Sequence, residues 1–416
     1  MILDLEANRR VIDRLRAIGI ILVICFHVVF GVATLLEEDA LHQYIDSLPS
    51  LFNIAWQAMG SELVFLFSGF LLSYLLLRDL KNHGRIDIGD FYVRRLSRIL
   101  PLYLVAIALY WLVRGFGITE LDDLVLNLLF VSKLSGAITI IPIGWSLEVL
   151  VQAYLLLPFV VLLFLRSGHA IKLTLAAITI SLAARHMALY LDPPSYHQKV
   201  YEFLFGTEAP ETQTDLYYLL GYRATPFLLG FLLAYLVIHK EQLLRLVFDR
   251  RWMSWVLILA SLVLIIISGF LPVHDQHSAL YEVTNDQFWL WFWTLQRFVF
   301  ALGICVITLC AWYGKVHLPA PVAWISRRNF GKSISRNIYS MYLFHPVFLI
   351  PAAVIGFRTY SAKEVGHIYT VEVVVVIALA VFFSAWFAQV LTRYVEAPAQ
   401  RQIRKRVRRV RWRVLT

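Results

Sequence analysis

The sequence predicts an all-α integral membrane protein, a bundle of about ten transmembrane helices with both chain ends on the cytoplasmic side. Of its 416 residues, 59% are hydrophobic and 16% are charged, and the mean hydropathy is +0.68. Soluble domains are nearer half apolar and a quarter charged, so this chain has too few polar residues to cover a surface in water. Ten long apolar stretches and a biased distribution of Lys and Arg support the same fold class.

The apolar stretches are candidates for helices that cross the membrane, because roughly 20 residues of helix span the hydrocarbon. They are 17–36, 54–77, 99–113, 143–165, 171–191, 216–238, 253–271, 289–313, 334–356 and 368–392. Segment 121–131 is apolar but too short to cross, and we expect it to be re-entrant or interfacial. No internal repeat or soluble domain is evident. We therefore expect one transmembrane domain over 1–392, followed by a basic cytoplasmic tail over 393–416.

The distribution of basic residues predicts the orientation. With the N-terminus inside, the cytoplasmic segments hold 30 of the 38 Lys and Arg residues, and the outer loops hold five. Lys and Arg are retained on the cytoplasmic side, so both ends are expected there. The acidic loops 192–215 and 272–288 are expected outside. The basic tail is expected to bind anionic lipid, and short basic clusters between apolar stretches indicate no nucleic-acid partner.

The first predicted span carries a histidine near its middle. Arg16 precedes His27 by eleven positions, which is close to three helical turns and places both on one face, ~16 Å apart along the axis. A cation at the membrane surface and an imidazole at depth suit a reaction with a long anionic donor. Alternatively, Arg16 anchors the helix at the surface and His27 is a hydrogen-bonded packing residue. The spacing alone leaves both interpretations open.

Further ionisable residues fall in the outer halves of five predicted spans. Placing such a side chain in hydrocarbon costs several kcal/mol unless it is paired or hydrated. We therefore expect these residues either to line a polar cavity that opens to the outside or to pair with one another inside the bundle. They are Glu62, Glu148, Arg185, Arg223 and Arg297.

A third basic group lies in FYVRRLSRILPLY, residues 91–103. Arg95 and Arg98, at positions i and i+3, share a face at the cytoplasmic start of the third span. The planar guanidinium suits phosphate because it donates two parallel hydrogen bonds. The alternative is an interfacial helix that contacts lipid phosphates. Pro101 is expected early in the helix that follows.

Two familiar chemistries are unsupported. Ser68 and Gly69 do not form a GxSxG elbow, so the sequence does not predict a hydrolase triad. The histidines lack an HExxH or other zinc spacing, so no metal site is expected.

Together these segments resemble the acyltransferase-3 family of membrane acyltransferases, which O-acylate cell-surface glycans. Seven motifs match in order. They are IDRLRAIGIILVICFH (12–27), ELVFLFSGFLLSYLL (62–76), FYVRRLSRILPLY (91–103), GWSLEVLVQAYLLLP (144–158), GYRATPFLLGFLLA (221–234), ISRNIYSMYLFHP (334–346) and RYVEAP (393–398).

The resemblance implies a cytoplasmic acyl-CoA donor, expected to be acetyl-CoA, as a co-substrate, with no permanently bound cofactor. The acceptor would be a hydroxyl of a lipid-linked or extracytoplasmic glycan, and the location a bacterial cytoplasmic membrane. Membrane lipids are the remaining expected partners. His27 would act either as general base on the acceptor hydroxyl or as a transient acyl carrier, and the family does not decide between them. The fused SGNH esterase-like domain of some members is not expected after the basic tail.

The expected site residues fall into three groups. The catalytic candidates are His27, Glu62 and Glu148. The donor-binding candidates are Arg16, Arg95 and Arg98. Further motif or pocket positions are Ser68, Gly69, Trp145, Ser146, Arg185, Arg223, Arg297 and His345.

One position departs from the family pattern. Members usually carry a Glu at the position of Leu150 or Val151, whereas this chain has Glu148, directly after Leu147. The shift places the carboxylate on another helix face, so the role taken from the family is in doubt, and an inactive scaffold remains an alternative. A transporter or flippase of a lipid-linked sugar is the other alternative, although no inverted repeat or pair of Gly/Pro-broken helices is visible.

Overall fold

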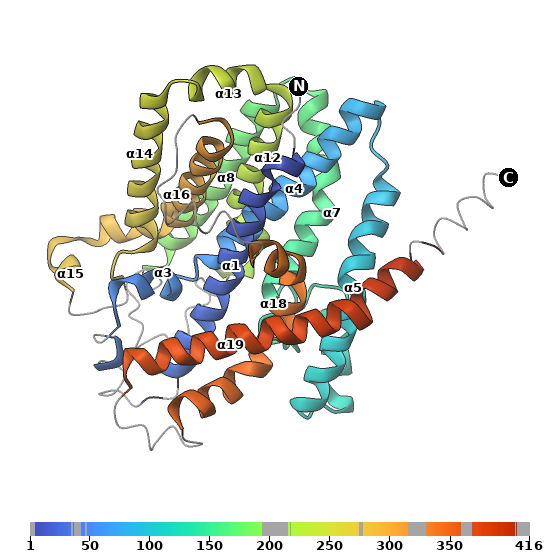
Figure 1. The fold of residues 1–416 in the computed structure, drawn as a ribbon, viewed down its shortest axis with the longest axis vertical. Coiled ribbons are helices and arrows are strands. Elements are labelled where there is room, and N and C mark those ends of the chain that lie inside the picture. The colour runs from blue at the N-terminus through green and yellow to red at the C-terminus, as the bar shows by residue number, and fades with distance from the viewer. Residues whose placement is uncertain are drawn as a thin grey trace.

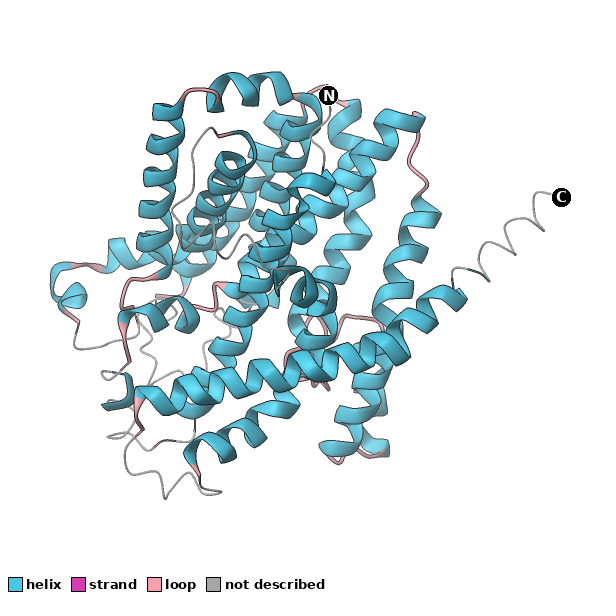
Figure 2. Cartoon of the chain, in the orientation of Figure 1, coloured by secondary structure: helices cyan, strands magenta, loops and turns pink. Residues whose placement is uncertain are grey.

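The computed structural model of the chain describes residues 5–34, 36, 43–45, 48–193, 215–216, 218–273, 278–314, 330–358, 368–403 and 405. Within these ranges every regular element is helical (Figure 2). Most of the predicted outer loop 192–215 and half of the predicted basic tail 393–416 lie outside the described residues.

Ten helices are long and apolar enough to cross a membrane, which confirms all ten predicted spans. Figure 1 shows them as one bundle with α13 (Glu241–Phe248) lying across one end. The long helices are α1 (Leu5–Ala33), α4 (Gly60–His83), α5 (Ile88–Val113), α7 (Trp145–Arg166), α8 (Ala170–Leu191), α12 (Leu220–His239), α14 (Arg251–Gly269), α16 (Asp286–Tyr313), α18 (Phe330–Phe357) and α19 (Thr370–Leu391). The side of the membrane on which each end lies stays a prediction from the charge distribution.

Short helices join the long ones at both ends of the bundle. The segment predicted to be re-entrant or interfacial contains the eight-residue α6 (Leu121–Leu128). The others are η1 (Ser50–Phe52), α3 (Asn53–Trp56), η2 (Ile118–Glu120), α15 (Ala279–Val283) and the π-helical turn η4 (Thr392–Glu396). The helical path of α19 continues through η4 to Ile403, past the boundary at 393 that the sequence predicted.

The third long helix begins eleven residues earlier than the predicted 99, because α5 starts at Ile88. Gly84 ends α4 in the left-handed conformation, with φ of 67°, and Asp87 caps α5 by accepting a hydrogen bond from the Asp90 amide. These local signals set where α4 ends and α5 begins, so α5 starts well before the apolar stretch at residue 99. Pro101 consequently lies inside the helix, and the prediction that it sits near the start is wrong.

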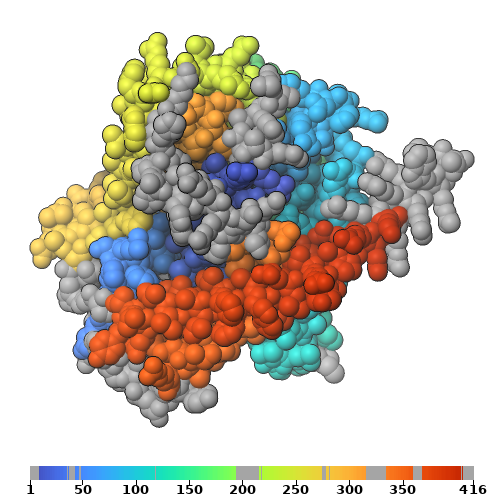
Figure 3. All heavy atoms as spheres, viewed as in Figure 1, coloured from blue at the N-terminus to red at the C-terminus, as the bar shows by residue number. Residues whose placement is uncertain are grey.

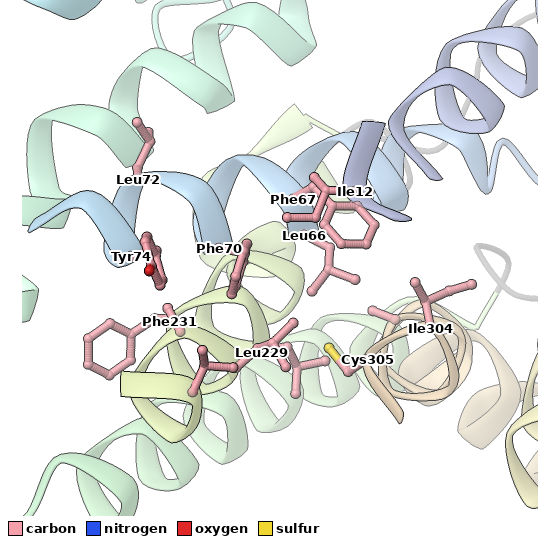
Figure 4. Close-up of a cluster of buried hydrophobic side chains, with 14 of the residues drawn as sticks. Ile12, Leu66, Phe67, Phe70, Leu72, Tyr74, Leu229, Phe231, Ile304 and Cys305 are labelled. Atoms are coloured by element: carbon pink, nitrogen blue, oxygen red, sulfur yellow. The ribbon is translucent and has the colours of Figure 1, made fainter. Parts of the chain in front are cut away.

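Helix α4 is central and packs closely against α1 and α12. A Cβ placed on Gly60 would lie 2.5 Å from the Gly19 carbonyl oxygen, and one on Gly230 would lie 2.4 Å from the Leu66 carbonyl oxygen. Such distances are possible only because these residues have no side chain, as is common where helices cross inside membranes. Figure 4 shows the apolar side chains that fill the space around this crossing, including Leu66 of α4 and Leu229 of α12.

The C-terminal helices α18 and α19 form the opposite side of the bundle. They share a buried apolar cluster with α1, and α19 runs obliquely across the outside of this face (Figures 1 and 3). Glu396, in η4, is buried and accepts hydrogen bonds from Ser340 of α18 at 3.2 Å and Thr392 at 3.3 Å. These bonds fix α18, which carries part of the site, against the end of α19.

Candidate functional site

A cavity of about 110 Å³ lies inside the bundle, between α1, α4, α5, α7 and α18. Arg16, Arg95 and Arg98 line it, and its described lining contains no carboxylate. The remaining wall is mostly apolar, with hydroxyl groups at intervals. These other lining residues are Ile20, Val23, Ser61, Val64, Phe65, Ser68, Leu71, Leu72, Ile99, Ser146, Leu147, Leu150, Tyr154, Ile338, Tyr339 and Tyr342.

A second space, of about 20 Å³, adjoins the first and reaches His27. Its lining shares Val23, Ser61, Ser146 and Tyr342 with the larger cavity, and the remaining lining residues are Phe26, His27, Ala58 and Trp145. Four residues border both spaces, so the two spaces are adjacent, and we refer to them together as the hollow. The hollow has three guanidinium groups along the larger cavity and an imidazole bordering the smaller space.

The three donor-binding candidates are brought together as the sequence predicted. Arg95 and Arg98 are half-buried on the inner face of α5. Arg16 donates a hydrogen bond from Nη1 to Ser335 Oγ at 3.2 Å, and Ser335 donates in turn to Asp13 at 2.9 Å. The positive charges of three guanidinium groups that line one cavity repel one another, so an anion that joins them would be bound favourably.

His27 contacts a second histidine across the bundle. Its Nδ1 lies 2.7 Å from the Val23 carbonyl oxygen and 3.2 Å from Nε2 of His345, on α18. His345 is wholly buried and lines neither space, whereas His27 is only half-buried. The sequence singled out both residues but gave no indication that they meet.

Glu62 is at the centre of an ion cluster beside the smaller space. Its Oε1 accepts from Arg297 at 2.7 Å and from Arg223 at 2.9 Å. Arg223 also donates to Ser61 Oγ at 3.0 Å, and Ser61 borders both spaces. Of the two interpretations drawn from the sequence, pairing inside the bundle is therefore what the structure shows for these three ionisable residues.

Arg185 lies near this cluster but is held by backbone oxygens. Its Nε donates to the Trp293 carbonyl at 2.8 Å and its Nη1 to the Leu216 carbonyl at 3.1 Å. Arg185 lies within electrostatic range of Arg223, Arg297 and Glu62, but Glu62 forms ion pairs with Arg223 and Arg297 only among the described residues.

Glu148 faces away from the hollow and secures the loop after α6. Ser132 Oγ donates to one carboxylate oxygen and the Lys133 amide to the other, at 3.0 Å. Burial lowers the pKa of Lys133, and the nearby Glu148 carboxylate opposes that shift. Neither Glu62 nor Glu148 lines the hollow, so their catalytic roles stay predictions.

The remaining predicted positions have distinct places. Ser68, Trp145 and Ser146 line the hollow, as expected of pocket residues. Gly69 instead allows a close approach, because a Cβ there would lie 2.6 Å from the Phe227 carbonyl oxygen. In the part of the chain that the structure describes, no group of three or more His, Cys, Asp or Glu side chains could hold a metal ion.

Sequence reasoning missed the tyrosines of the hollow. Tyr342 accepts a hydrogen bond from Ser146 Oγ at 2.6 Å and donates to the Ile143 carbonyl, which ties α18 to the start of α7. Tyr154 and Tyr339 line the larger cavity. A signal was present for Tyr342, because it precedes His345 by three positions and so lies on the same helix face.

The fold defines an integral membrane protein with internal cavities enclosed by its transmembrane helices. The sequence identifies the family: the family model described as “Acyltransferase domain”, acyltransferase family 3, matches residues 9–389. The chain therefore belongs to this family of acyl-transferring enzymes, which confirms the resemblance drawn from its motifs.

Individual relatives carry similar names. A Staphylococcus aureus (strain COL) protein named “Putative O-acetyltransferase SACOL0978” is 23% identical over 369 residues, which cover 83% of this chain and 53% of that protein. The Bacillus subtilis (strain 168) “Putative peptidoglycan O-acetyltransferase YrhL” is 26% identical over 201 residues, 40% of this chain and 31% of that protein. The chain thus spans about half the length of the staphylococcal relative. No solved structure matches significantly.

Proposed function

We propose that the protein transfers an acyl group, acetyl in particular, from cytoplasmic acyl-CoA to a hydroxyl of a lipid-linked or extracytoplasmic glycan. The observation that carries the proposal is the pair of adjacent cavities, with Arg16, Arg95 and Arg98 along the larger one and His27 bordering the smaller one. The proposed setting is a bacterial cytoplasmic membrane, with the arginines facing the cytoplasm.

In this proposal the arginines bind the phosphates of CoA, and the pantetheine arm lies along the apolar wall. Arg16 and His27 are eleven residues apart on α1, which corresponds to ~16 Å of helix. That length suits a donor whose charged end and reactive thioester are far apart. The donor carries the acyl group, so no bound cofactor or metal is required.

The chemistry we propose for His27 is general-base catalysis. Its imidazole accepts the proton of the acceptor hydroxyl as the oxygen attacks the thioester carbonyl. The C–S bond then breaks, the CoA thiolate takes the proton, and an O-ester is formed. The alternative drawn from the sequence, attack by the imidazole on the thioester to carry the acyl group transiently, gives the same products in two steps.

The test is acyl transfer by the purified full-length protein in lipid nanodiscs, with radiolabelled acetyl-CoA and a lipid-linked glycan. The wild type should bind donor and release CoA as the acceptor is acetylated. The His27→Ala variant should lose roughly 10²–10⁴-fold or more in transfer rate and still bind acetyl-CoA, because the phosphate contacts are remote. Near-normal transfer by folded His27→Ala would contradict the role of His27. Absence of any acyl-CoA binding by the wild type would favour a transporter.

A further inference from the structure

His345 contacts His27, and its burial limits the part that it can play in a reaction. His345 has no exposed surface and borders neither part of the hollow, so it does not reach a bound substrate. The two rings lie 4.8 Å apart between centroids, at 57° to each other. Their shortest polar contact is the 3.2 Å between His27 Nδ1 and His345 Nε2.

The neighbouring carbonyl groups determine which ring nitrogens carry protons. A carbonyl oxygen only accepts, so the 2.7 Å contact with the Val23 carbonyl requires a proton on His27 Nδ1. The 2.8 Å contact with the Tyr342 carbonyl likewise requires a proton on His345 Nδ1. If both rings are neutral, the Nε2 atoms of His27 and His345 are then unprotonated. His345 Nε2 can therefore only accept, and it shares the Nδ1–H of His27 with the Val23 carbonyl.

Pro346 provides the local cause of this arrangement. In an α-helix the amide of residue 346 would bond to the carbonyl of Tyr342, but proline has no N–H. The Tyr342 carbonyl therefore accepts no hydrogen bond from residue 346, and His345 Nδ1 donates to it instead. The sequence His-Pro within α18 thus fixes both the orientation and the protonation of His345.

We propose that His345 is the positioning residue of His27. His345 Nε2 accepts a hydrogen bond from His27 Nδ1–H and so fixes the orientation of the His27 ring. In this orientation the unprotonated Nε2 of His27 points away from the α1 backbone, toward the hollow. When Nε2 takes the acceptor proton, the ring becomes an imidazolium, and the Nδ1–H···Nε2 bond to His345 stabilises that charge. This is the part that a carboxylate plays in a Ser-His-Asp triad. The inference rests on the proposed function only in taking His27 as the base.

The kinetic test compares an acceptor-retaining substitution with one that removes the acceptor. His345→Gln keeps an oxygen that can accept from His27 Nδ1–H, whereas His345→Leu does not. We expect His345→Leu to lower kcat by on the order of 10- to 100-fold, in line with loss of one charge-assisted hydrogen bond. The KM for acetyl-CoA should stay within about twofold, and His345→Gln should recover most of kcat.

The matched control is His186→Leu, because His186 on α8 is also hydrogen-bonded inside the bundle, 3.1 Å from Thr294 Oγ1, and borders neither part of the hollow. Its kcat should be near that of the wild type. Normal kcat in His345→Leu would overturn the proposal, as would a loss in His345→Gln as large as in His345→Leu. A loss confined to KM would also overturn it.

A second measurement needs neither activity nor a stable Leu variant. In 15N-histidine-labelled wild-type protein in lipid, nuclear magnetic resonance should show His27 protonated at Nδ1 and bare at Nε2, with a scalar coupling to His345 Nε2 across the hydrogen bond. A proton on His27 Nε2 instead, or no coupling, would overturn the positioning role. Because no donor is present, failure of acetyl transfer in the wild type would count against the proposed function and leave this result intact.

Discussion

At the residue scale, adjacent arginines of α5 have different surroundings, and this separates the donor-binding candidates from their neighbour. Arg95 and Arg98 line the cavity. Arg94 points outward, with 52% of its side chain exposed, and pairs with Asp90 one helical turn away. An exposed pair of this kind contributes at most about 1 kcal/mol. The sequence RRLSR thus divides between a face that lines the cavity and a solvated or headgroup-facing one.

Arg95→Ala is expected to weaken acetyl-CoA binding by roughly 10- to 100-fold, since a hydrogen bond to a charged group contributes about 1.5–3 kcal/mol. The loss should be larger at low salt, where the phosphate–guanidinium attraction is unscreened. Binding to protein in nanodiscs at two ionic strengths measures this. Arg94→Ala is the matched control and should bind normally. Equal affinity of the two variants would reduce Arg95 to a lipid anchor.

At the element scale, the site depends on how closely α4 approaches α1 and α12. Val23 and Ser61 border both parts of the hollow from opposing helices, α1 and α4. Their separation is set by Gly60, where a side chain would meet the backbone of α1. On the other face of α4, Gly230 of α12 has the same function. Small residues at the crossings therefore determine the width of the space that surrounds His27.

Gly230→Ala is expected to destabilise the protein by ~1–3 kcal/mol, the usual cost of overpacking, because its Cβ would lie 2.4 Å from the Leu66 carbonyl oxygen. Thermal unfolding in detergent measures the effect as a lowered midpoint. Gly221→Ala is the control on the same helix, since nothing lies within 4 Å of a Cβ there. If Gly230→Ala and Gly221→Ala unfold at the same midpoint temperature, α4 and α12 do not approach each other as closely as the structure indicates.

At the scale of the whole molecule, charge predicts which end of the bundle faces the cytoplasm. Cysteine substitutions with a membrane-impermeant maleimide on intact cells test it, at Asp249, between α13 and α14, and at Asp192, after α8. We expect labelling at 192 only. The natural Cys25, Cys305 and Cys310 lie within long helices and should give little background. Labelling at 249 from outside would reverse the orientation and the proposed donor side with it.

Three arginines near one paired carboxylate, Glu62, also predict the nature of the acceptor. Among the described residues, positive charges outnumber negative ones in this region, which should favour an acceptor that carries a phosphate or an acidic sugar. Initial transfer rates with a lipid-diphosphate-linked glycan and with the same glycan free of phosphate measure the preference. We expect the charged form to react at least about tenfold faster, the effect of roughly 1.4 kcal/mol. Equal rates would contradict an anionic acceptor.

The sequence by itself determined the number and approximate place of the membrane helices. Inside a bilayer the backbone must satisfy its own hydrogen bonds, so a long apolar stretch has almost no alternative to a helix. It also placed Arg16 above His27 and Arg95 beside Arg98, because both pairs depend only on helical periodicity. Where a local end signal mattered more than apolarity, as at Asp87, the predicted start of α5 was wrong.

Only the tertiary structure decided which residues meet across the bundle. His27 and His345 are 318 positions apart, and Glu62 is 235 positions from Arg297. Nothing in a helical period fixes such pairs, because they depend on which helices are neighbours and at what rotation they pack. Glu148 illustrates the same limit: its place on α7 was predictable, but whether it faced the hollow or the Ser132 loop was settled by packing.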